Sequence, residues 1–436
     1  AENVLYEYLK NRERVPDDNT AQVWAENFLK NSHERSGLLV ERDPGIYTFL
    51  HKGFMEYLAA SALAQQSKTL VGLLLPLVAD KGKFEWWEQV ILLVGAYSGT
   101  PEDVREDLIA TLLEIAETNP LNSEERLRYQ LLAGNLARDM GDDLPVAHFK
   151  QVEAALLKSS LDSVTLPIRR ASAADTLDEL GYAIPDLHAF IPIPKSPSIN
   201  YEFAVSKYPV TNGQYERFLK SDFNNKKYWV DFQKYDENSA VMTNQTWGEE
   251  PWDWMQKALQ NEESETQESV LLPRGWRDPR FGISRRNAPV VGISWYEASA
   301  YCNWLLENWE NLEEGKQGLS KPKEIRLPLE KEWSTAAGGE DPKERYAWDK
   351  KGAKTKTEDL PRFANTSESG INRTTPVWMY PQGESPHGVM DMSGNVWEWQ
   401  ANYRDLKNGW LGLRGGSWGY DEDLARVVIR HDSLPY

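Results

Sequence analysis

The sequence predicts a multidomain protein with an α-helical N-terminal half and an α+β C-terminal domain. At 436 residues the chain is too long for one ordinary core. Of its 18 tryptophans, only Trp24, Trp86 and Trp87 precede residue 200. The first part is rich in Leu, Ala and Glu, and the second is rich in Trp, Gly and Asn. Helical domains and loop-rich aromatic domains differ in composition in this way.

Charge and cysteine content limit the partners and the compartment. A net charge of −18 argues against a nucleic-acid backbone or an anionic membrane as the partner. The single cysteine excludes an internal disulfide and fits a reducing compartment. The start at Ala1 is neither a signal peptide nor a membrane span, and no apolar run is long enough to cross a bilayer. We therefore expect a soluble, cytoplasmic protein.

Residues 1–65 predict a small mixed module. A helical pattern at 23–29 is followed by two short apolar runs, at 37–40 and 47–50, with an Asp-Pro-Gly turn between them. This order predicts a β-hairpin. Leu50, Phe54, Tyr57 and Leu58 then recur at helical spacing and predict a helix with an apolar stripe.

The stretch from Ser36 to Ala60, which contains Phe49, His51 and Phe54, resembles the winged-helix end of a NACHT-type (STAND) signal-transduction NTPase. The resemblance implies that His51 senses nucleotide by touching the β-phosphate of bound ADP. The alternative is a histidine at a helix start that caps its neighbours. The sequence has no Gly-x-x-x-x-Gly-Lys-Ser/Thr phosphate loop. We therefore expect the nucleotide-binding half to precede Ala1, which would make this chain a fragment.

Residues 66–185 predict an irregular helical spacer, because amphipathic and fully apolar helical patterns follow one another. The stretch 168–181 resembles a HEAT-like repeat helix that ends in a C-cap glycine. Prolines concentrate at 184–198, and we place a linker at 186–198 and the C-terminal domain at 199–436. Self-association through the helical half remains open.

The C-terminal half is organised around the segment 391–399 (Asp-Met-Ser-Gly-Asn-Val-Trp-Glu-Trp). Alternation over 396–399 predicts a strand whose two tryptophans share one buried face. The Gly-Asn turn before it tolerates positive φ and can aim carbonyl oxygens at one point. With the carboxylates of Asp391 and Glu398, the segment offers the oxygen ligands that Ca²⁺ prefers. The alternative is a bulged strand in which Glu398 accepts backbone N–H bonds.

Five motifs occur in order between about residue 196 and the end of the sequence: Pro209–Asn212, Ser294–Ala298 with Tyr301, Cys302 and Trp304, Arg326–Trp333, Gly394–Trp399 and Arg414–Trp418. Together they resemble the formylglycine-generating-enzyme (sulfatase-modifying-factor) family. The resemblance implies a C-type-lectin-like fold. Between the first two motifs, residues 222–286 have no clear period and predict a surface insertion.

The same resemblance implies structural calcium. The first ion is expected on side-chain oxygens of Asp391 and Glu398 and on carbonyl oxygens of Gly394 and Val396. A second ion is expected near Asn365 and Thr366.

The residues that catalysis would need are missing. Enzymes of that family oxidise a substrate cysteine with copper held by two cysteines just beyond the Arg-Gly-Gly-Ser motif. The matching positions are about Tyr420 and Ala425, which do not ligate Cu(I). Cys302 falls on the apolar stripe of a predicted helix, where a cysteine acts as a small hydrophobic residue. Only His387 and His431 lie in the C-terminal domain, too few for a three-histidine iron site. We expect neither copper nor iron.

The tail after Trp418 mixes aromatic, acidic and aliphatic residues without a helix or strand pattern, as a recognition surface does. It resembles the ligand-binding tail of variable proteins made by diversity-generating retroelements, which use the same lectin-like fold. Carried over, the exposed ligand-binding positions are Tyr420, Asp421, Asp423, Leu424, Ile429, His431, Asp432 and Ser433. We expect Arg426 and Arg430 to anchor this tail through carboxylates. That family continues to a closing Gly-Phe-Arg strand, which this sequence lacks.

Two functions therefore compete. The first is a non-catalytic sensor, in which a lectin-like domain binds a protein or another macromolecule and is joined to part of a signalling module. The second is a metal-dependent oxidoreductase on the same fold. The missing cysteine pair and the scattered histidines favour the sensor.

Overall fold

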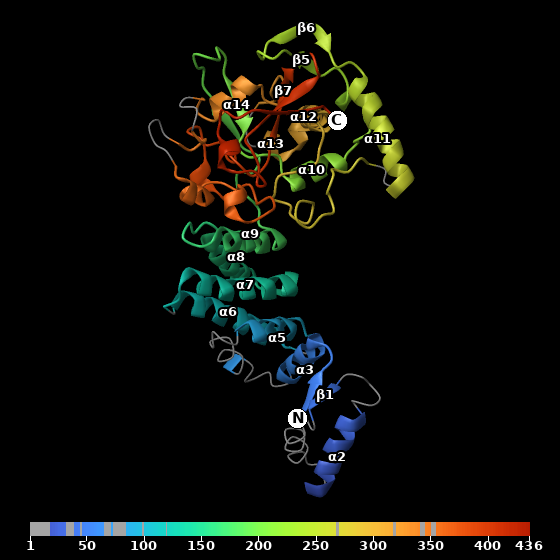
Figure 1. Ribbon diagram of the computed structural model, residues 1–436, viewed down its shortest axis with the longest axis vertical. Helices are drawn as coiled ribbons and strands as arrows, with labels where there is room; N and C mark the ends of the chain where they lie inside the picture. Colours follow the sequence, from blue (N-terminus) through green and yellow to red (C-terminus); the bar gives the residue numbers. More distant parts are fainter. Residues whose placement is uncertain are drawn as a thin grey trace. The chain divides into compact units, whose positions relative to one another are not determined.

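The computed structural model describes the chain over residues 18–31, 39–43, 46–64, 71–72, 84–97, 100–118, 120–266, 270–316, 320–340, 345–349 and 355–436. The chain divides into two compact units, one of residues 1–118 and 132–152 and the other of residues 119–131 and 153–436 (Figure 1). The division falls within the helical half. The end of the predicted spacer, from residue 153 onward, therefore belongs to the same unit as the C-terminal domain.

The first unit contains the predicted hairpin. Helix α2 (Asp18–Asn31) comes before strands β1 (Leu39–Asp43) and β2 (Ile46–Phe49), which pair antiparallel. Helix α3 (Lys52–Ala64) follows at once. Residues 44–45 of the predicted turn lie outside the described residues.

The apolar stripe of α3 does not face the core of its unit. Phe54, Tyr57 and Leu58 are each about half exposed, at 48%, 51% and 49%. Helix α3 instead buries Glu56, Ala60 and Ala64. The buried side of this helix therefore lacks the large apolar side chains of the predicted stripe.

Helices fill the spacer, as predicted. They are α5 (Phe84–Ala96), α6 (Glu102–Thr118), α7 (Ser123–Met140), α8 (Val146–Ser160) and α9 (Pro167–Glu179). Pro167 fits the first position of α9, where its missing N–H costs no hydrogen bond. Beyond the other end, Gly181 has a φ of 78° and Tyr182 donates its N–H to the carbonyl of Leu177 at 2.9 Å. This geometry confirms the predicted C-cap glycine.

The C-terminal domain is α+β. Its helices are α10 (Asn212–Leu219), α11 (Glu250–Thr266), α12 (Trp295–Asn308), α13 (Glu313–Lys316) and α14 (Glu330–Ala336). Its strands are β3 (Phe190–Ile193), β4 (Phe203–Ser206), β5 (Gln233–Tyr235), β6 (Val241–Thr246), β7 (Glu398–Asp405), β8 (Trp410–Arg414) and β9 (His431–Ser433).

Short 3₁₀ helices occur at Gly141–Asp143, Lys226–Tyr228, Trp309–Asn311, Thr357–Arg362, Ser367–Ser369, Pro381–Gly383 and Glu422–Ala425.

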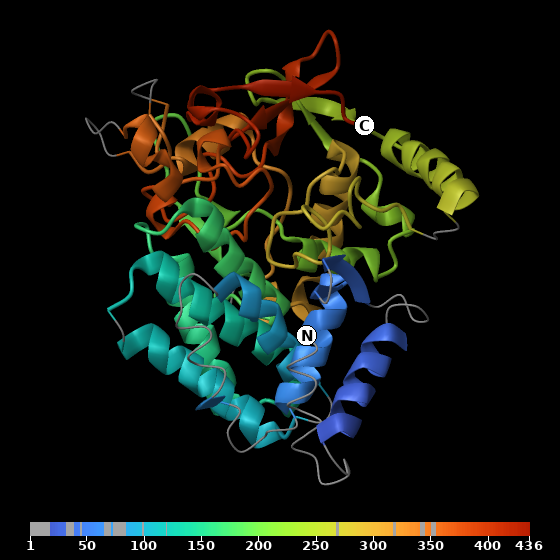
Figure 2. The same ribbon diagram turned by 60° about the horizontal axis from the view of Figure 1, so that its bottom comes forward.

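The described strands form antiparallel groups. β3 pairs with β4, β5 pairs with β6, and β7, β8 and β9 form a three-stranded sheet in that order. In both views helix α11 projects from one side of the domain (Figures 1 and 2). Because β3 lies at 190–193 and pairs with β4, the linker predicted at 186–198 is wrong. Its prolines border a strand of the domain.

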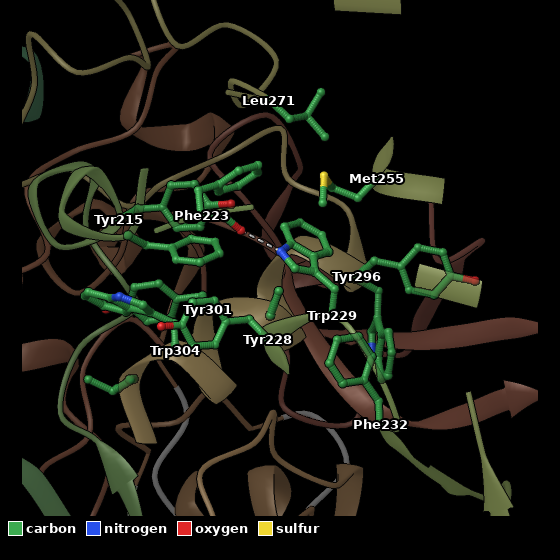
Figure 3. Close-up of a cluster of buried hydrophobic side chains, with 14 of the residues drawn as sticks. Tyr215, Phe223, Tyr228, Trp229, Phe232, Met255, Leu271, Tyr296, Tyr301 and Trp304 are labelled. Carbon is green, nitrogen blue, oxygen red and sulfur yellow. Dashed lines mark hydrogen bonds between the residues drawn. The ribbon is translucent and has the colours of Figure 1, made fainter. Parts of the chain in front are cut away.

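An aromatic core holds the domain together (Figure 3). Trp229 is fully buried, and its indole N–H donates to the carbonyl of Phe223 at 2.9 Å. Trp247 packs against Trp295 of α12 with ring centroids 5.3 Å apart. The prediction that 222–286 is a surface insertion is therefore wrong, because this segment supplies core residues. Its aromatic positions have no helix or strand period, since loops carry many of them.

The segment 396–399 departs from the predicted strand. β7 begins only at Glu398. The ring of Trp397 lies 5.8 Å from Tyr420 and 5.4 Å from His431, both exposed residues, whereas Trp399 packs against the aromatic core. The two tryptophans therefore do not share one buried face. The reason is that strand alternation does not extend back into the turn.

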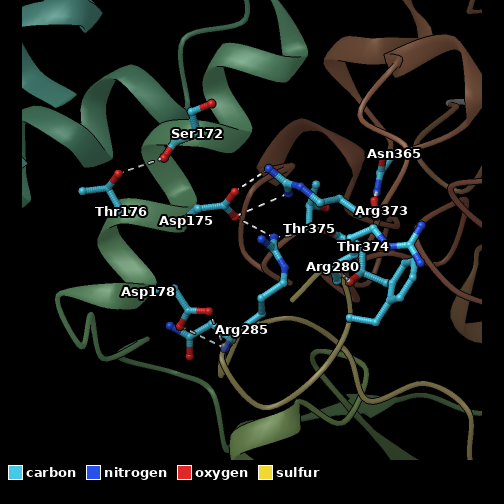
Figure 4. Close-up of polar contacts among 12 residues, drawn as sticks. Ser172, Asp175, Thr176, Asp178, Arg280, Arg285, Asn365, Arg373, Thr374 and Thr375 are labelled. Atoms are coloured by element: carbon cyan, nitrogen blue, oxygen red, sulfur yellow. Dashed lines mark hydrogen bonds and ion pairs between the residues drawn. The ribbon is translucent and has the colours of Figure 1, made fainter. Parts of the chain in front are cut away.

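Helix α9 is fixed to the C-terminal domain by buried polar contacts (Figure 4). The carboxylate of Asp175 forms ion pairs with Arg373 and, at 2.6 Å, with Arg285. The carboxylate of Asp178 accepts the backbone N–H of Asn287 at 3.0 Å. The spacer thus ends in a helix that is part of the lectin-like unit.

Candidate functional site

The turn before β7 has a left-handed backbone at three positions. Asp391, Gly394 and Asn395 have φ values of 55°, 93° and 64°. At Gly394 a Cβ atom would stand 2.8 Å from the carbonyl oxygen of Asn365. Only glycine fits there, which explains the Gly-Asn pair read from the sequence.

Asn395 ties the turn to its surroundings. Its amide nitrogen donates to the carboxylate of Asp391 at 2.8 Å and to the carbonyl of Thr375 at 3.1 Å, and its amide oxygen accepts the N–H of Thr375 at 3.0 Å. Its backbone N–H donates to Asn365, and its carbonyl accepts from Trp418. The turn is therefore a rigid, fully buried junction.

Two carboxylates near this turn are shielded from water. Burial raises the pKa of Asp391 to about 7, although the hydrogen bond from Asn395 lowers it. Burial also raises the pKa of Glu398 to about 8, and the charge of Asp391 adds to that rise. Glu398 is partly exposed as a residue, but its carboxylate accepts the indole N–H of Trp333 of α14 at 2.8 Å. Among the described residues, no cation forms an ion pair with either carboxylate.

The donor set fits a hard cation. Asp391 and Glu398 offer two carboxylates that have no paired cation among the described residues. The carbonyl oxygens of Val396 and Met392 lie 3.4 and 3.8 Å from where a Cβ on Gly415 would stand. The predicted carbonyl of Gly394 already accepts the N–H of Val396 at 2.9 Å. Oxygen-only donors with two acids suit Ca²⁺ better than a soft metal. Calcium at Asp391, Gly394, Val396 and Glu398 stays a prediction.

At the second predicted ion position, Asn365 and Thr366 have protein partners. The amide nitrogen of Asn365 donates to the carbonyl of Arg373 at 2.9 Å, and its amide oxygen accepts from Ser369 at 2.9 Å. The hydroxyl of Thr366 donates to Glu368 at 2.6 Å. The second Ca²⁺ likewise stays a prediction.

A buried arginine that the sequence reading did not single out supports the tail. Arg414 is 0% exposed, and its guanidinium donates to Glu330 at 3.2 Å, to Glu340 at 2.7 Å and to the carbonyl of Val427 at 2.8 Å. In the sequence, only the position of Arg414 in the Arg-Gly-Gly-Ser-Trp motif indicated that this residue matters.

The predicted anchors of the tail use carboxylates, as expected. Arg430 lies 3.6 Å from Glu330 and 3.7 Å from Glu340. Arg426 pairs with Asp423 at 2.7 Å. The latter pair lies within the tail, so that of these two arginines it is Arg430 that pairs with carboxylates of the scaffold.

The predicted ligand-binding positions reach the surface. Five of them are exposed, and three are partly buried: the exposed ones are Tyr420, Asp421, Asp423, His431 and Ser433, and the others are Leu424, Ile429 and Asp432. Ala425 and Val427 between them are buried, at 1% and 0%. The tail thus presents side chains outward from a backbone that is fixed to the core.

The residues at the copper positions lack copper chemistry. Tyr420 is 43% exposed, and Ala425 is buried. Burial raises the pKa of the Cys302 thiol to about 12, so that little thiolate exists at neutral pH. Within the described part of the chain, no group of three or more His, Cys, Asp or Glu side chains is placed to hold a metal.

His51, the predicted nucleotide sensor, lies directly before α3 in the first unit and is exposed. Its ring centroid is 6.2 Å from that of Phe54, and its carbonyl accepts the N–H of Phe54 at 3.2 Å. Its backbone thus begins the helix, which leaves the imidazole open to solvent.

Over the described ranges, no helix is long and apolar enough to cross a membrane.

Comparison with known proteins agrees with this arrangement. The family model of the sulfatase-modifying factor enzyme 1-like domain matches residues 187–436, and that of the winged helix-turn-helix domain C-terminal to NACHT matches residues 1–63. The inactive C-alpha-formylglycine-generating enzyme 2 of Bos taurus is 30% identical over 252 residues, which are 53% of this chain and 72% of that protein.

Two further similarities cover the same domain. The hercynine oxygenase of Mycobacterium tuberculosis is 26% identical over 54% of this chain and 49% of its own length. The structure of Treponema denticola variable protein 1 aligns with 56% of this chain and 86% of its own, at 20% identity and a TM-score of 0.29.

The first family model covers more than half of the chain, and it includes the turn at Asp391, the Arg414 anchor and the exposed tail. The chain therefore belongs to the sulfatase-modifying factor enzyme 1-like family, with a NACHT-type winged-helix segment at its N-terminal end.

Proposed function

We propose that this chain is a non-catalytic sensor. Its C-terminal domain binds a protein or another macromolecule through the tail, and its helical half belongs to a NACHT/STAND signalling module. The observation that carries the proposal is the tail itself, which keeps buried anchors and exposes varied side chains. It has Tyr420 and Ala425 at the two positions where a copper enzyme of this family needs cysteines. Nucleic acid and membrane are not expected as partners, and the expected compartment is the cytoplasm.

The remaining features have supporting roles in this proposal. Calcium at the Asp391 turn would be structural, because Asp391 is buried and Glu398 bonds to Trp333 of α14. His51 would act only together with an upstream nucleotide domain. The tail would be diversified if the neighbouring DNA encodes a reverse transcriptase and a near-copy of the coding sequence of the tail.

The direct test replaces Tyr420 and Leu424 with alanine together. A binder is first selected from a displayed library of small protein domains against the wild-type chain. We expect the double variant to weaken binding by about 30-fold or more, since hot-spot losses are about 2 kcal/mol or more. Its melting temperature should change little, because Tyr420 is exposed and Leu424 is only partly buried, and surface substitutions usually alter stability by less than about 0.5 kcal/mol.

The matched control replaces Leu406 and Trp410, which are 38% and 41% exposed on the β7–β8 hairpin. Replacing these two residues should leave the affinity for the selected binder unchanged. Unfolding of the Tyr420/Leu424 variant would show that the tail is core, which contradicts the sensor. Copper-dependent formation of formylglycine on a sulfatase-type peptide would favour the oxidoreductase instead.

A further inference from the structure

We infer that Trp397, together with Tyr420 and His431, forms a site for the cationic side chain of an arginine or lysine from a partner protein. The inference rests on the proposed binding function and names the chemistry of its partner. Trp397 lies outside the predicted ligand-binding positions, whereas the other two belong to them.

The three aromatic side chains come from separate parts of the chain. Trp397 precedes β7, Tyr420 follows the Arg-Gly-Gly-Ser-Trp motif, and His431 begins β9. The ring of Trp397 lies 5.8 Å from that of Tyr420 at 76° and 5.4 Å from that of His431 at 48°. Neither neighbouring ring is stacked flat on the indole, and Trp397 is partly exposed. An indole face is the best aromatic partner for a cation.

The backbone of Trp397 is fixed from below. Val396 before it is 7% exposed, and Glu398 after it accepts the indole N–H of Trp333 at 2.8 Å. Tyr420 is held through its backbone, whose carbonyl accepts the N–H of Ser367 at 2.9 Å. Little ordering is therefore needed when a ligand binds, which favours affinity.

The charges near these rings favour a cation. Asp421 is exposed next to Tyr420. The arginines of the tail are already paired: Arg426 lies 2.7 Å from Asp423, and Arg430 lies near Glu330 and Glu340. The chain as a whole carries −18. This surface would repel an anionic partner, whereas it would attract a cation.

The surface is exposed, as a protein-binding surface is. Tyr420 is 43% exposed and His431 is exposed. Arginine and lysine carry both the charge and an aliphatic stem that can cover these rings. An arginine can also stack its guanidinium plane on an aromatic face.

The experiment follows Trp397 directly. The wild-type chain is labelled with fluorotryptophan, and the Trp397 signal in the fluorine NMR spectrum is assigned from its loss in Trp397→Phe. Capped pentapeptides Gly-Gly-X-Gly-Gly are titrated, with Arg, Lys, Gln or Glu at X. We expect the Arg and Lys peptides to shift the Trp397 signal in a saturable way, and the Gln and Glu peptides to leave it in place.

Two controls sharpen the result. The signal of Trp410, an exposed tryptophan on β8, should not move with any peptide. Tyr420→Ala should weaken binding of the Arg peptide by about two- to fivefold, as the loss of one exposed cation–π contact predicts. Equal shifts with Gln or Glu, an equal shift at Trp410, or no shift at all would overturn the inference. If the Tyr420/Leu424 variant still loses its selected binder in that case, the proposed function stands without this site.

Discussion

The dependence of the tail on single residues is clearest at Arg414. Its guanidinium bonds to Glu330 and Glu340, which lie 84 and 74 residues earlier in the chain. The motif around Arg414 was visible in the sequence, but its partners were not, because no local pattern connects residues so far apart. A buried charge of this kind has a high cost when its partner is removed.

We therefore predict that Arg414→Met destabilises the protein by about 3–5 kcal/mol, because Glu330 would stay buried without its main counter-charge. Arg426→Ala should cost at most about 1 kcal/mol, since Asp423 is 66% exposed and surface ion pairs contribute little. Urea unfolding of the two variants measures the difference. Equal losses would show that Arg414 does not anchor the tail.

At the scale of elements, local signals predicted helices well. The capping box of α10, in which Thr211 and Gln214 bond reciprocally, fixes its start at Asn212. The Ser294 capping box fixes the start of α12 in the same way. Both boxes are local in sequence, so they can be read without knowledge of the fold.

Elements that depend on distant contacts were predicted less well. The linker at 186–198 contains β3 because pairing with β4 overrides its prolines. Residues 222–286 were predicted to be an insertion because the sequence there has no helix or strand period. Many of their buried aromatic residues lie in loops, which leave no such period. For the candidate site, the sequence located the Asp391 turn and the exposed tail. It did not reveal that Trp397 faces this tail, because that contact joins three separate segments.

The contact between α9 and the domain should depend on pH through Asp178. Burial raises the pKa of Asp178 to about 7 from 3.8, while the N–H of Asn287 and the charge of Arg285 lower it and Asp175 raises it. The folded state thus binds more protons than the unfolded state between these values. The free energy of unfolding should therefore fall as the pH rises from about 4 to about 7.

Asp178→Asn keeps an oxygen for Asn287 and removes this titration. We predict that urea midpoints between pH 5 and pH 8 fall less steeply in the variant than in the wild type. Glu202→Gln, at an exposed position, should keep the wild-type slope. An unchanged slope in Asp178→Asn would assign the dependence to other groups.

At the scale of the whole molecule, two compact units imply two unfolding transitions rather than one. The unit with the Asp391 turn should respond to calcium, and the unit with the winged-helix segment should not. The reason is that ligands stabilise only the part of the chain that binds them. Composition alone indicated two parts, but it did not place the division inside the helical spacer.

We predict that calcium at about 100 times its dissociation constant raises one of the two calorimetric transitions by about 5–10 °C, since the linkage supplies about 2.7 kcal/mol. Glu398→Gln should abolish the shift, because the amide removes one of the two charges that a cation would neutralise. Glu384→Gln, an exposed change near the turn, should keep it. If both transitions fall at the same temperatures in calcium and in chelator, the Asp391 turn does not hold Ca²⁺. If the shift persists in Glu398→Gln, the ion binds elsewhere in the chain.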